Sequence, residues 1–416
     1  MLNLATRPNL LHPGPMTFLN TDFAAAAEAE YPAMIALRRA IHADPEIGLH
    51  CRRTTEKLKA SLAGLPLEIR DSNSTSGFTA TLRGARPGRT VLLRGDMDAL
   101  PIHEETGLDF SSQTAGAMHA CGHDTHSAML AAAARILCAQ QASLEGSVVF
   151  MFQPGEEGHH GARFMIEDGL LDDPRPDAAF ALHIWPTLPA GTVTSRSGAL
   201  LASTDALNAT IRGRGGHAAM PYQTIDPIPV ACEAVGALQA YIARAVPFFD
   251  AAVISVTQIQ AGTAYNIIPE TVDLKGTLRT LSDERRDDGR AAFERIVRGV
   301  AETHGCTADI RIDHGYPATR NDGRAVALAE ELTDDLFGPG KWLPMPSPLM
   351  GGEDFAYVLQ QVPGCMAFLG VAPPNEEAEG RAGLHHPKMT VHEEALQQGV
   401  ALHCAFATRF LARGWE

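Results

Sequence analysis

Three short apolar runs constrain the fold of this chain more strongly than any other feature of the sequence. They cover residues 89–93, 146–152 and 177–182. Residues 146–152 form a continuous apolar run, which is typical of a buried strand, and the other two runs are strand-like and mostly apolar. A helix-like segment, residues 127–138, separates the first run from the second. This alternation of strands and helices predicts an α/β fold built around a mostly parallel sheet.

Polar side chains follow each of the three runs, at the point where the strand ends. Open parallel sheets bind ligands beyond the carboxyl ends of their strands, so we expect these side chains to share one crevice. Carboxylates placed there could bind metal, orient a ligand or decorate a turn. The residues are Asp96 and Asp98 after the first run, Glu156 and Glu157 after the second, and His183 after the third.

Residues 118–126, with the sequence Met-His-Ala-Cys-Gly-His-Asp-Thr-His, carry the densest set of side chains that can bind metal. Cys121 and His123 are separated by one glycine, a spacing that lets a tight loop turn both side chains toward one ion. A thiolate and an imidazole together suit zinc or a neighbouring transition metal. A buried structural cysteine beside histidines with other partners is the alternative, and this segment alone leaves both interpretations open.

Length, charge and cysteine content limit the classes of protein to consider. The chain has 416 residues, 45% of them hydrophobic, which predicts two domains with sizeable cores. A net charge of −15 argues against nucleic acid or an anionic membrane as a partner. Seven scattered cysteines form no disulfide framework and favour a cytoplasmic location. Residues 1–30 resemble neither a signal peptide nor a membrane span, and we expect them to form an N-terminal extension.

The pattern changes after residue 203, where polar and apolar residues begin to alternate as in a half-exposed antiparallel strand. We predict a smaller α+β domain over residues 204–318, inserted into a larger domain formed by residues 31–203 and 319–416. His42 and Glu46 follow the first predicted helix, and we interpret them as a solvated helix end.

A set of motifs spread over nearly the whole chain resembles a known family. The resemblance is to the metal-dependent amidohydrolases and peptidases that include aminoacylases, hippurate hydrolases and auxin-conjugate (indole-acetyl amino acid) hydrolases. The order and spacing of the motifs are more specific than any motif alone. They are residues 95–101 (Gly-Asp-Met-Asp-Ala-Leu-Pro), 118–124, 153–157 (Gln-Pro-Gly-Glu-Glu), 182–183, 215–218, 266–269, 351–355 (Gly-Gly-Glu-Asp-Phe) and 385–387.

The resemblance implies a catalytic domain that holds one or two divalent ions of zinc, manganese, cobalt or nickel. It also implies that the smaller domain is a lid that forms a homodimer or a higher homo-oligomer. Glu156 is implied as the general base, and Asp96 and Asp98 as supports for the ligands. The implied metal ligands are Cys121, His123, Glu157, His183 and His385.

Three lid residues complete the implied site. His217 is expected to donate a hydrogen bond to the oxyanion of the transition state, although it could instead cap a glycine turn. Asn266 and Arg279 are candidates for binding the α-carboxylate of the substrate, because amide and guanidinium groups donate well to carboxylates.

The expected reaction is hydrolysis of the amide bond of a small N-acyl amino acid. Many relatives carry a histidine at position 96 and an aspartate at position 121, whereas Asp96 and Cys121 place this chain in the cysteine-containing branch. That branch favours N-acyl amino acids over dipeptides. A metallo-dipeptidase or carboxypeptidase is one alternative. A metal-stabilised interaction protein with a decayed active site is another, although retention of Glu156 beside Glu157 favours an enzyme.

Overall fold

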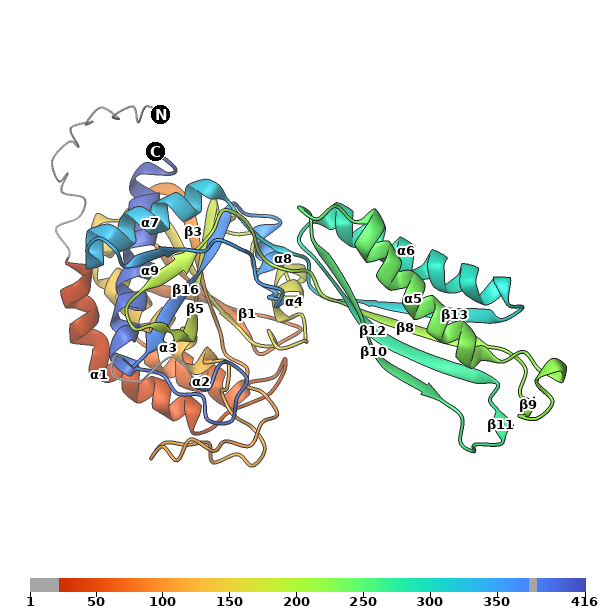
Figure 1. Cartoon of the computed structure of the whole chain (residues 1–416). Helices are drawn as coiled ribbons and strands as arrows, with labels where there is room; N and C mark the ends of the chain where they lie inside the picture. Colours follow the sequence, from red (N-terminus) through yellow and green to blue (C-terminus); the bar gives the residue numbers. More distant parts are fainter. Residues whose placement is uncertain (1–21, 374–379) are drawn as a thin grey trace, which may run out of the picture.

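The structure, a computed structural model, describes residues 22–373 and 380–416 and contains two units that lie side by side (Figure 1). The larger unit is built around an eight-stranded sheet with the strand order β1-β2-β4-β3-β5-β16-β6-β15. These strands are β1 (Leu67–Asp71), β2 (Phe78–Arg83), β3 (Arg86–Asp96), β4 (Glu145–Gln153), β5 (Ala178–Pro189), β6 (Val193–Ser195), β15 (Trp342–Pro344) and β16 (Gly364–Ala372).

The four central strands of this sheet, β4, β3, β5 and β16, run parallel to one another. Antiparallel pairing is confined to β1, β2 and the β16–β6 contact nearer the edges. The three apolar runs of the sequence are β3, β4 and β5, each buried over most of its length. The predicted α/β class with a mostly parallel sheet is therefore confirmed.

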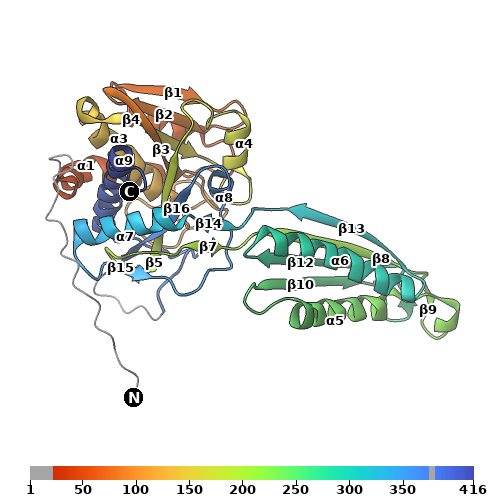
Figure 2. The same ribbon diagram turned by 90° about the horizontal axis from the view of Figure 1, so that it is seen from above.

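Helices cover both faces of the large sheet (Figure 2). One face packs against α1, α3, α7 and α9, and the other against the short helices α4 and α8. The Ala-rich α3 is buried at nearly every position, which explains its continuous apolar sequence. The helices of this unit are α1 (Phe23–His42), α2 (Arg52–Ser61), α3 (His123–Ala139), α4 (Gly161–Glu167), α7 (Gly323–Phe337), α8 (Ala356–Leu359) and α9 (Leu396–Arg413).

The first helix begins earlier than the sequence pattern predicted. We expected an extension over residues 1–30 and a helix from about Tyr31, but α1 starts at Phe23. The Asp22 side chain caps it by accepting the N–H groups of Ala24 and Ala25, each at 3.1 Å. Pro32 lies inside α1 and made the helix look interrupted in sequence. Residues 1–21 lie outside the described part of the chain.

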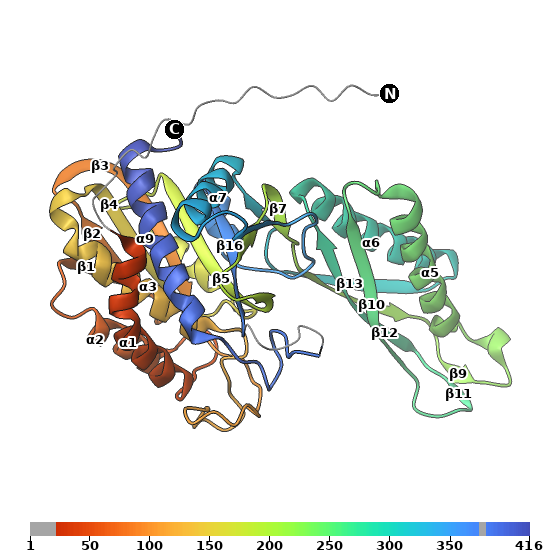
Figure 3. The same ribbon diagram turned by 60° about the vertical axis from the view of Figure 1, so that its left-hand side comes forward.

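The second unit is a four-stranded antiparallel sheet with the order β10-β12-β8-β13, covered on one face by α5 and α6 (Figure 3). Burial alternates along β8, as the polar–apolar pattern predicted. A small pair of strands, β9 and β11, lies at its tip. The elements are β8 (Asp205–Arg212), β9 (Gly216–His217), α5 (Pro227–Ala245), β10 (Ala252–Ala261), β11 (Ile267–Ile268), β12 (Thr271–Thr280), α6 (Asp283–Thr303) and β13 (Thr307–His314).

Two chain segments connect the units, one leading from β7 (Gly198–Leu201) into β8 and the other from β13 into β14 (Thr319–Asn321). β7 and β14 pair with each other, so both connections leave the larger unit at the same place. All seven cysteines are free thiols, and only Cys232 is exposed. Within the described ranges, no helix combines the length and the hydropathy needed to span a bilayer.

Candidate metal centre

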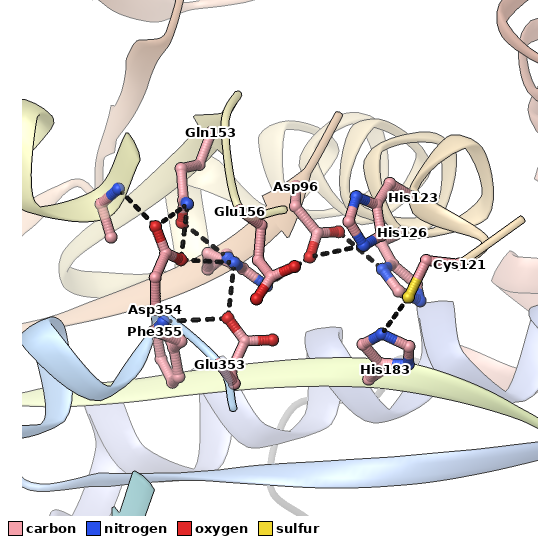
Figure 4. Close-up of polar contacts among 12 residues, drawn as sticks. Asp96, Cys121, His123, His126, Gln153, Glu156, His183, Glu353, Asp354 and Phe355 are labelled. Atoms are coloured by element: carbon pink, nitrogen blue, oxygen red, sulfur yellow. Dashed lines mark hydrogen bonds and ion pairs between the residues drawn. The ribbon is translucent and has the colours of Figure 1, made fainter. Parts of the chain in front are cut away.

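The loop before α3 brings Cys121 and His123 to the carboxyl ends of the central strands (Figure 4). Gly122 between them has φ 83°, and a Cβ atom there would lie 2.3 Å from the Ile184 side chain. Only glycine satisfies both conditions at low cost, so the Cys-Gly-His sequence is a requirement of this turn. His123 then starts α3, and its ring is fully buried.

The five side chains implied as metal ligands are close together. The Cys121 thiol lies 3.4 Å from Nε2 of His183 and 3.3 Å from Nε2 of His385. Nε2 of His385 is also 3.1 Å from the Glu157 carboxylate. Among the described residues, five groups of three side chains have donor atoms within 4.8 Å of one another and could hold an ion. Two of these groups consist only of the implied ligands, and both include Cys121. The groups are Cys121, His123 and His183, and Cys121, Glu157 and His385.

His183 is oriented to present one particular nitrogen to this cluster. Its Nδ1 donates to the carbonyl of Ile184 at 2.7 Å, which leaves a lone pair on Nε2. Burial, and then the nearby His126, hold the pKa of His183 well below its usual range. The ring is therefore neutral, as a metal-binding imidazole must be.

His385 is held differently, because it lies on a loop and its side chain is 53% exposed. Its φ of 63° is unusual for a residue other than glycine, and such conformations cluster at functional sites. Hydrogen bonds with Cys121 and then with Glu157 raise the pKa of His385 to about 10. Metal binding must displace this proton, so affinity should fall as pH falls.

The unpartnered ring of His123 is a structural indication that these residues fit a metal ion. The ring nitrogens of His123 are buried and, within the described residues, neither has a hydrogen-bond partner. The nearest carboxylate oxygens, from Asp96 and Asp98, are 3.5 Å away, longer than a normal hydrogen bond. Leaving such groups unsatisfied is costly, and a metal ion would satisfy them.

Glu156 lies beside the cluster with its side chain buried at 6% exposure. Burial raises the pKa of this carboxyl well above its usual range, and Glu353 and Glu157 raise it further. A divalent cation held by the adjacent Glu157 would favour the ionised form and reverse part of this shift. The two neighbouring glutamates therefore have different surroundings, since Glu157 contacts His385 whereas Glu156 faces Glu353 and Asp354.

Asp96 and Asp98 both lie next to His123, on opposite nitrogens of its ring. Asp98 also accepts the backbone N–H groups of Glu156 and Glu157, each at 3.0 Å, and so holds both glutamates in place. Asp96 accepts from Nδ1 of His126 at 2.6 Å.

We did not assign a role to His126 from the sequence. It lies one helical turn after His123 on α3, the spacing that places two side chains on one face. Its Nε2 accepts the Ile184 N–H at 2.9 Å. His126 thereby ties the end of β3, through Asp96, to Ile184 within β5. We expected this strand to end at Leu182, before His183, but it continues through His183 to Pro189.

A buried arginine network behind Glu156 was also missed. Arg94, 1% exposed, donates to Asp96 at 2.6 Å, to Glu353 at 2.9 Å and to Asp354 at 3.1 Å. Burial and the guanidinium of Arg94 act in opposite directions on the pKa of Asp354, and burial prevails, raising it to about 8. The acidic pair was visible in the 351–355 motif, but nothing in the sequence indicated Arg94 as its partner.

Our interpretation of His42 and Glu46 as a solvated helix end is wrong. His42 is 1% exposed, and its Nδ1 lies 2.8 Å from the carboxylate of Asp124, the residue after His123. The Glu46 carboxylate accepts the N–H of Thr54 at 2.8 Å and so satisfies a free backbone donor in the first turn of α2. Both errors have one cause, because the loop of residues 99–120 folds back over this helix end and buries it.

The three residues predicted to act from the second unit, His217, Asn266 and Arg279, do not contact the metal-ligand cluster of the same chain. His217 in β9 and Asn266 just before β11 are both at the tip of the second unit, the end farthest from the first (Figures 1 and 3). Arg279 is near the other end of β12, which has 10 residues and is about 30 Å long. One chain therefore does not bring Asn266 and Arg279 together.

The His217 ring is exposed, and its Nδ1 accepts the N–H of Ala219 at 3.1 Å. His217 thus caps the turn that follows it, which is the alternative role expected from the sequence. The same bond places the proton of the neutral ring on Nε2, where it can be donated.

Comparison with known proteins gives a consistent result. Residues 92–409 match peptidase family M20/M25/M40. N-acetylcysteine deacetylase of Bacillus subtilis is 36% identical over 372 residues, covering 89% of this chain and 95% of that protein. Thermostable carboxypeptidase 1 of Saccharolobus solfataricus is 34% identical over 384 residues, covering 91% and 95%.

A solved structure agrees with this chain in fold. The crystal structure of the YXEP protein of Bacillus subtilis, a dinuclear metal-binding peptidase from family M20, superposes with a TM-score of 0.79 at 34% identity. It covers 92% of this chain and 99% of that one. The expected metal-dependent hydrolase class is confirmed by these relatives together with the ligand groups described above. The chain belongs to peptidase family M20/M25/M40.

Proposed function

We propose that this enzyme hydrolyses the amide bond of N-acyl amino acids, such as N-acetyl or hippurate-like N-benzoyl derivatives, to a carboxylate and a free amino acid. The observation that carries this proposal is the pair of adjacent glutamates in different surroundings. Glu157 is in contact with the metal-binding side chains, while Glu156 is buried beside them. The similarity to a protein named N-acetylcysteine deacetylase supports the substrate class.

The proposed metal ligands would hold one or two divalent ions, with zinc, manganese, cobalt and nickel as candidates, because thiolate, imidazole and carboxylate ligands suit these metals. When bound, such an ion polarises the amide carbonyl and lowers the pKa of water near it. The ligands we propose are Cys121, His123, Glu157, His183 and His385.

Glu156 is the proposed general base. Its carboxylate would take a proton from the attacking water and later deliver this proton to the nitrogen of the leaving amino acid. Asp98 supports the geometry by holding the backbone of Glu156 and Glu157. Asp96 supports it through His126 and Arg94.

His217 and Asn266 are proposed to act from the lid, which we assign to residues 204–318 between the catalytic segments 31–203 and 319–416. The lid tip also exposes Tyr222 at 79% and Tyr265 at 103%, large apolar surfaces suited to contact with another subunit. A homodimer or higher oligomer could place His217 of one subunit at the metal centre of another. Arg279, at the inner end of β12, would then bind the substrate carboxylate from its own chain.

A carboxypeptidase or dipeptidase activity is the second candidate, because one relative is named a carboxypeptidase. The test is a substrate panel after metal removal and reloading with each candidate ion in turn. We expect kcat/KM for N-acetyl and N-benzoyl amino acids to exceed that for dipeptides by at least about tenfold, a difference of about 1.4 kcal/mol. The reverse preference would favour the peptidase, and no activity with any metal would favour a decayed site.

The proposed partner is a small molecule only. The net charge of −15 would repel nucleic acid and anionic membranes. The seven free cysteines suit a reducing compartment, and we propose a cytoplasmic location on this basis.

A further inference from the structure

The two segments that connect the units are bonded to each other where they cross. The backbone N–H of Thr204 donates to the carbonyl of Tyr316 at 2.9 Å, and the N–H of Tyr316 donates to Oγ1 of Thr204 at 2.8 Å. Thr204, Gly315 and Tyr316 form this crossing of the two segments. The backbones approach so closely that a Cβ atom at Gly315 would lie 2.0 Å from the Thr204 carbonyl oxygen, so only glycine fits there. A rotation of the second unit must therefore move Tyr316 or break these contacts.

Tyr316 also reaches the site. Its side chain is 6% exposed, and its hydroxyl donates a hydrogen bond to the backbone carbonyl of Glu156. The ring packs edge-on against the imidazole of His160, with centroids 4.9 Å apart. Burial, and then Asp354, raise the pKa of Tyr316, so the hydroxyl remains a donor over the whole working pH range.

The backbone at Glu156 is thus held from two directions. Asp98, at the end of β3, accepts the N–H groups of Glu156 and Glu157. Tyr316, on the connection returning from the second unit, binds the carbonyl of Glu156. Asp98 follows the last residue of β3 by two positions and so is anchored to the larger unit, whereas Tyr316 is bonded to the crossing. Displacement of the crossing would therefore act on Glu156 through this carbonyl.

We propose that Tyr316 is a positioning residue that couples the crossing between the two units to the backbone of Glu156. The hydroxyl fixes the Glu156 carbonyl, and the orientation of that peptide sets where the carboxyl group lies. The role of Tyr316 in the reaction rests on the proposed function of Glu156 as general base. Movement of the second unit would then adjust the base as well as the lid residues.

The first test is Tyr316→Phe, with Tyr357→Phe as a matched control. The Tyr357 ring lies in the same aromatic group, with its centroid 6.2 Å from that of Tyr316, and its hydroxyl contacts Gly315 and His160. Arg286 also binds the Gly315 carbonyl, at 2.7 Å, so this carbonyl stays held in the control. For Y316F we expect kcat to fall about five- to tenfold with KM and metal content within about twofold, as for loss of one hydrogen bond. For Y357F, kcat should stay within about twofold of wild type.

Thr204→Val tests the same link from the crossing. This substitution removes the side-chain acceptor of the Tyr316 N–H without touching Glu156 or the aromatic rings. We expect kcat to fall about threefold or more, again with little change in KM. It also keeps the inference testable if Y316F proves too unstable to assay.

Both substitutions are then repeated in a Glu156→Gln background, since groups that act through one another are not additive. We expect Y316F and T204V to change the residual rate of E156Q by less than about twofold. The inference would be overturned if Y316F and T204V both had the kcat of wild type. It would also be overturned if each substitution lowered the rate by the same factor in the wild-type and the E156Q backgrounds. A wild-type kcat in E156Q itself would instead overturn the proposed base, so the two failures are distinguishable.

Discussion

The metal cluster in the first unit and the lid tip in the second contrast in how their functional side chains are held. Glu156 and His123 are buried. The backbone N–H of Glu156 is bonded to Asp98, and His123 is the first residue of α3. His217 lies on a two-residue strand and is exposed, with one backbone contact through its ring. The first unit therefore presents an ordered cluster, while the lid tip is suited to complete a site elsewhere. Substitutions in the two regions should differ in effect accordingly.

Replacing the base should give the largest effect. Glu156→Gln should keep metal content near that of wild type and lower kcat by about 100-fold to 10,000-fold, the range expected for loss of a general base. Glu157→Gln is the matched control, since it should lose metal instead. Metal analysis and steady-state kinetics of both variants measure the difference. Equal metal loss in both variants would contradict the separate roles of the two glutamates.

His217→Ala tests the lid tip in the same terms. If the ring donates to the oxyanion, kcat should fall by about 100-fold to 1,000-fold, with metal content unchanged. This corresponds to a loss of about 2.7–4 kcal/mol of transition-state stabilisation. A normal kcat would remove His217 from the reaction.

Mixing subunits decides which chain supplies this histidine. Inactive E156Q subunits combined with inactive H217A subunits should recover part of the activity, because one site in each mixed dimer regains both groups. Native mass spectrometry establishes that mixed dimers have formed. If they form without recovery, the site is not shared between subunits.

A smaller effect is expected for the cysteine that both ligand groups include. A bound metal should shield Cys121 from iodoacetamide, so metal-free protein should be alkylated several-fold faster at this position. The exposed Cys232 serves as an internal control, because its rate should not depend on metal. Peptide mapping by mass spectrometry gives both rates from one sample. Equal protection of Cys121 with and without metal would assign it a structural role.

The last prediction concerns stability rather than activity, at a histidine in the core of the first unit. His403 in α9 is 1% exposed, and burial and then His126 lower its pKa to about 3. The folded state thus keeps the His403 ring neutral, whereas the same ring in the unfolded chain takes up a proton near pH 6.5. Below pH 6.5 protonation favours the unfolded chain, so the stability that neutral His403 contributes is complete above pH 6.5 and is lost as pH falls toward 3.

His403→Leu should therefore make the free energy of unfolding less dependent on pH below 6.5, by up to about 1.4 kcal/mol per pH unit. Urea unfolding of wild type and H403L between pH 7 and pH 4 measures this slope. Parallel pH profiles for the two proteins would contradict the shifted pKa.

Much of the fold followed from local patterns in the sequence. The apolar runs at 89–93, 146–152 and 177–182 were sufficient to predict β3, β4 and β5 and their parallel arrangement, because strands buried on both faces leave a continuous apolar signal. The alternation in 205–212 likewise predicted β8. The beginning of α1 was missed because Pro32 resembles a helix boundary in sequence.

The sequence by itself determined which residue types the site contains and that Asp96 and Glu156 would lie at neighbouring strand ends. It placed His183 after the third strand, whereas His183 lies within β5. Only the tertiary structure decided which side chains hold them: Arg94 between three carboxylates, His42 on Asp124, and Tyr316 on the Glu156 carbonyl. The reason is physical, since strand and helix periodicity is a local property that burial imprints on neighbouring residues. A buried polar group instead selects any partner that the fold brings within hydrogen-bond distance, however remote in sequence.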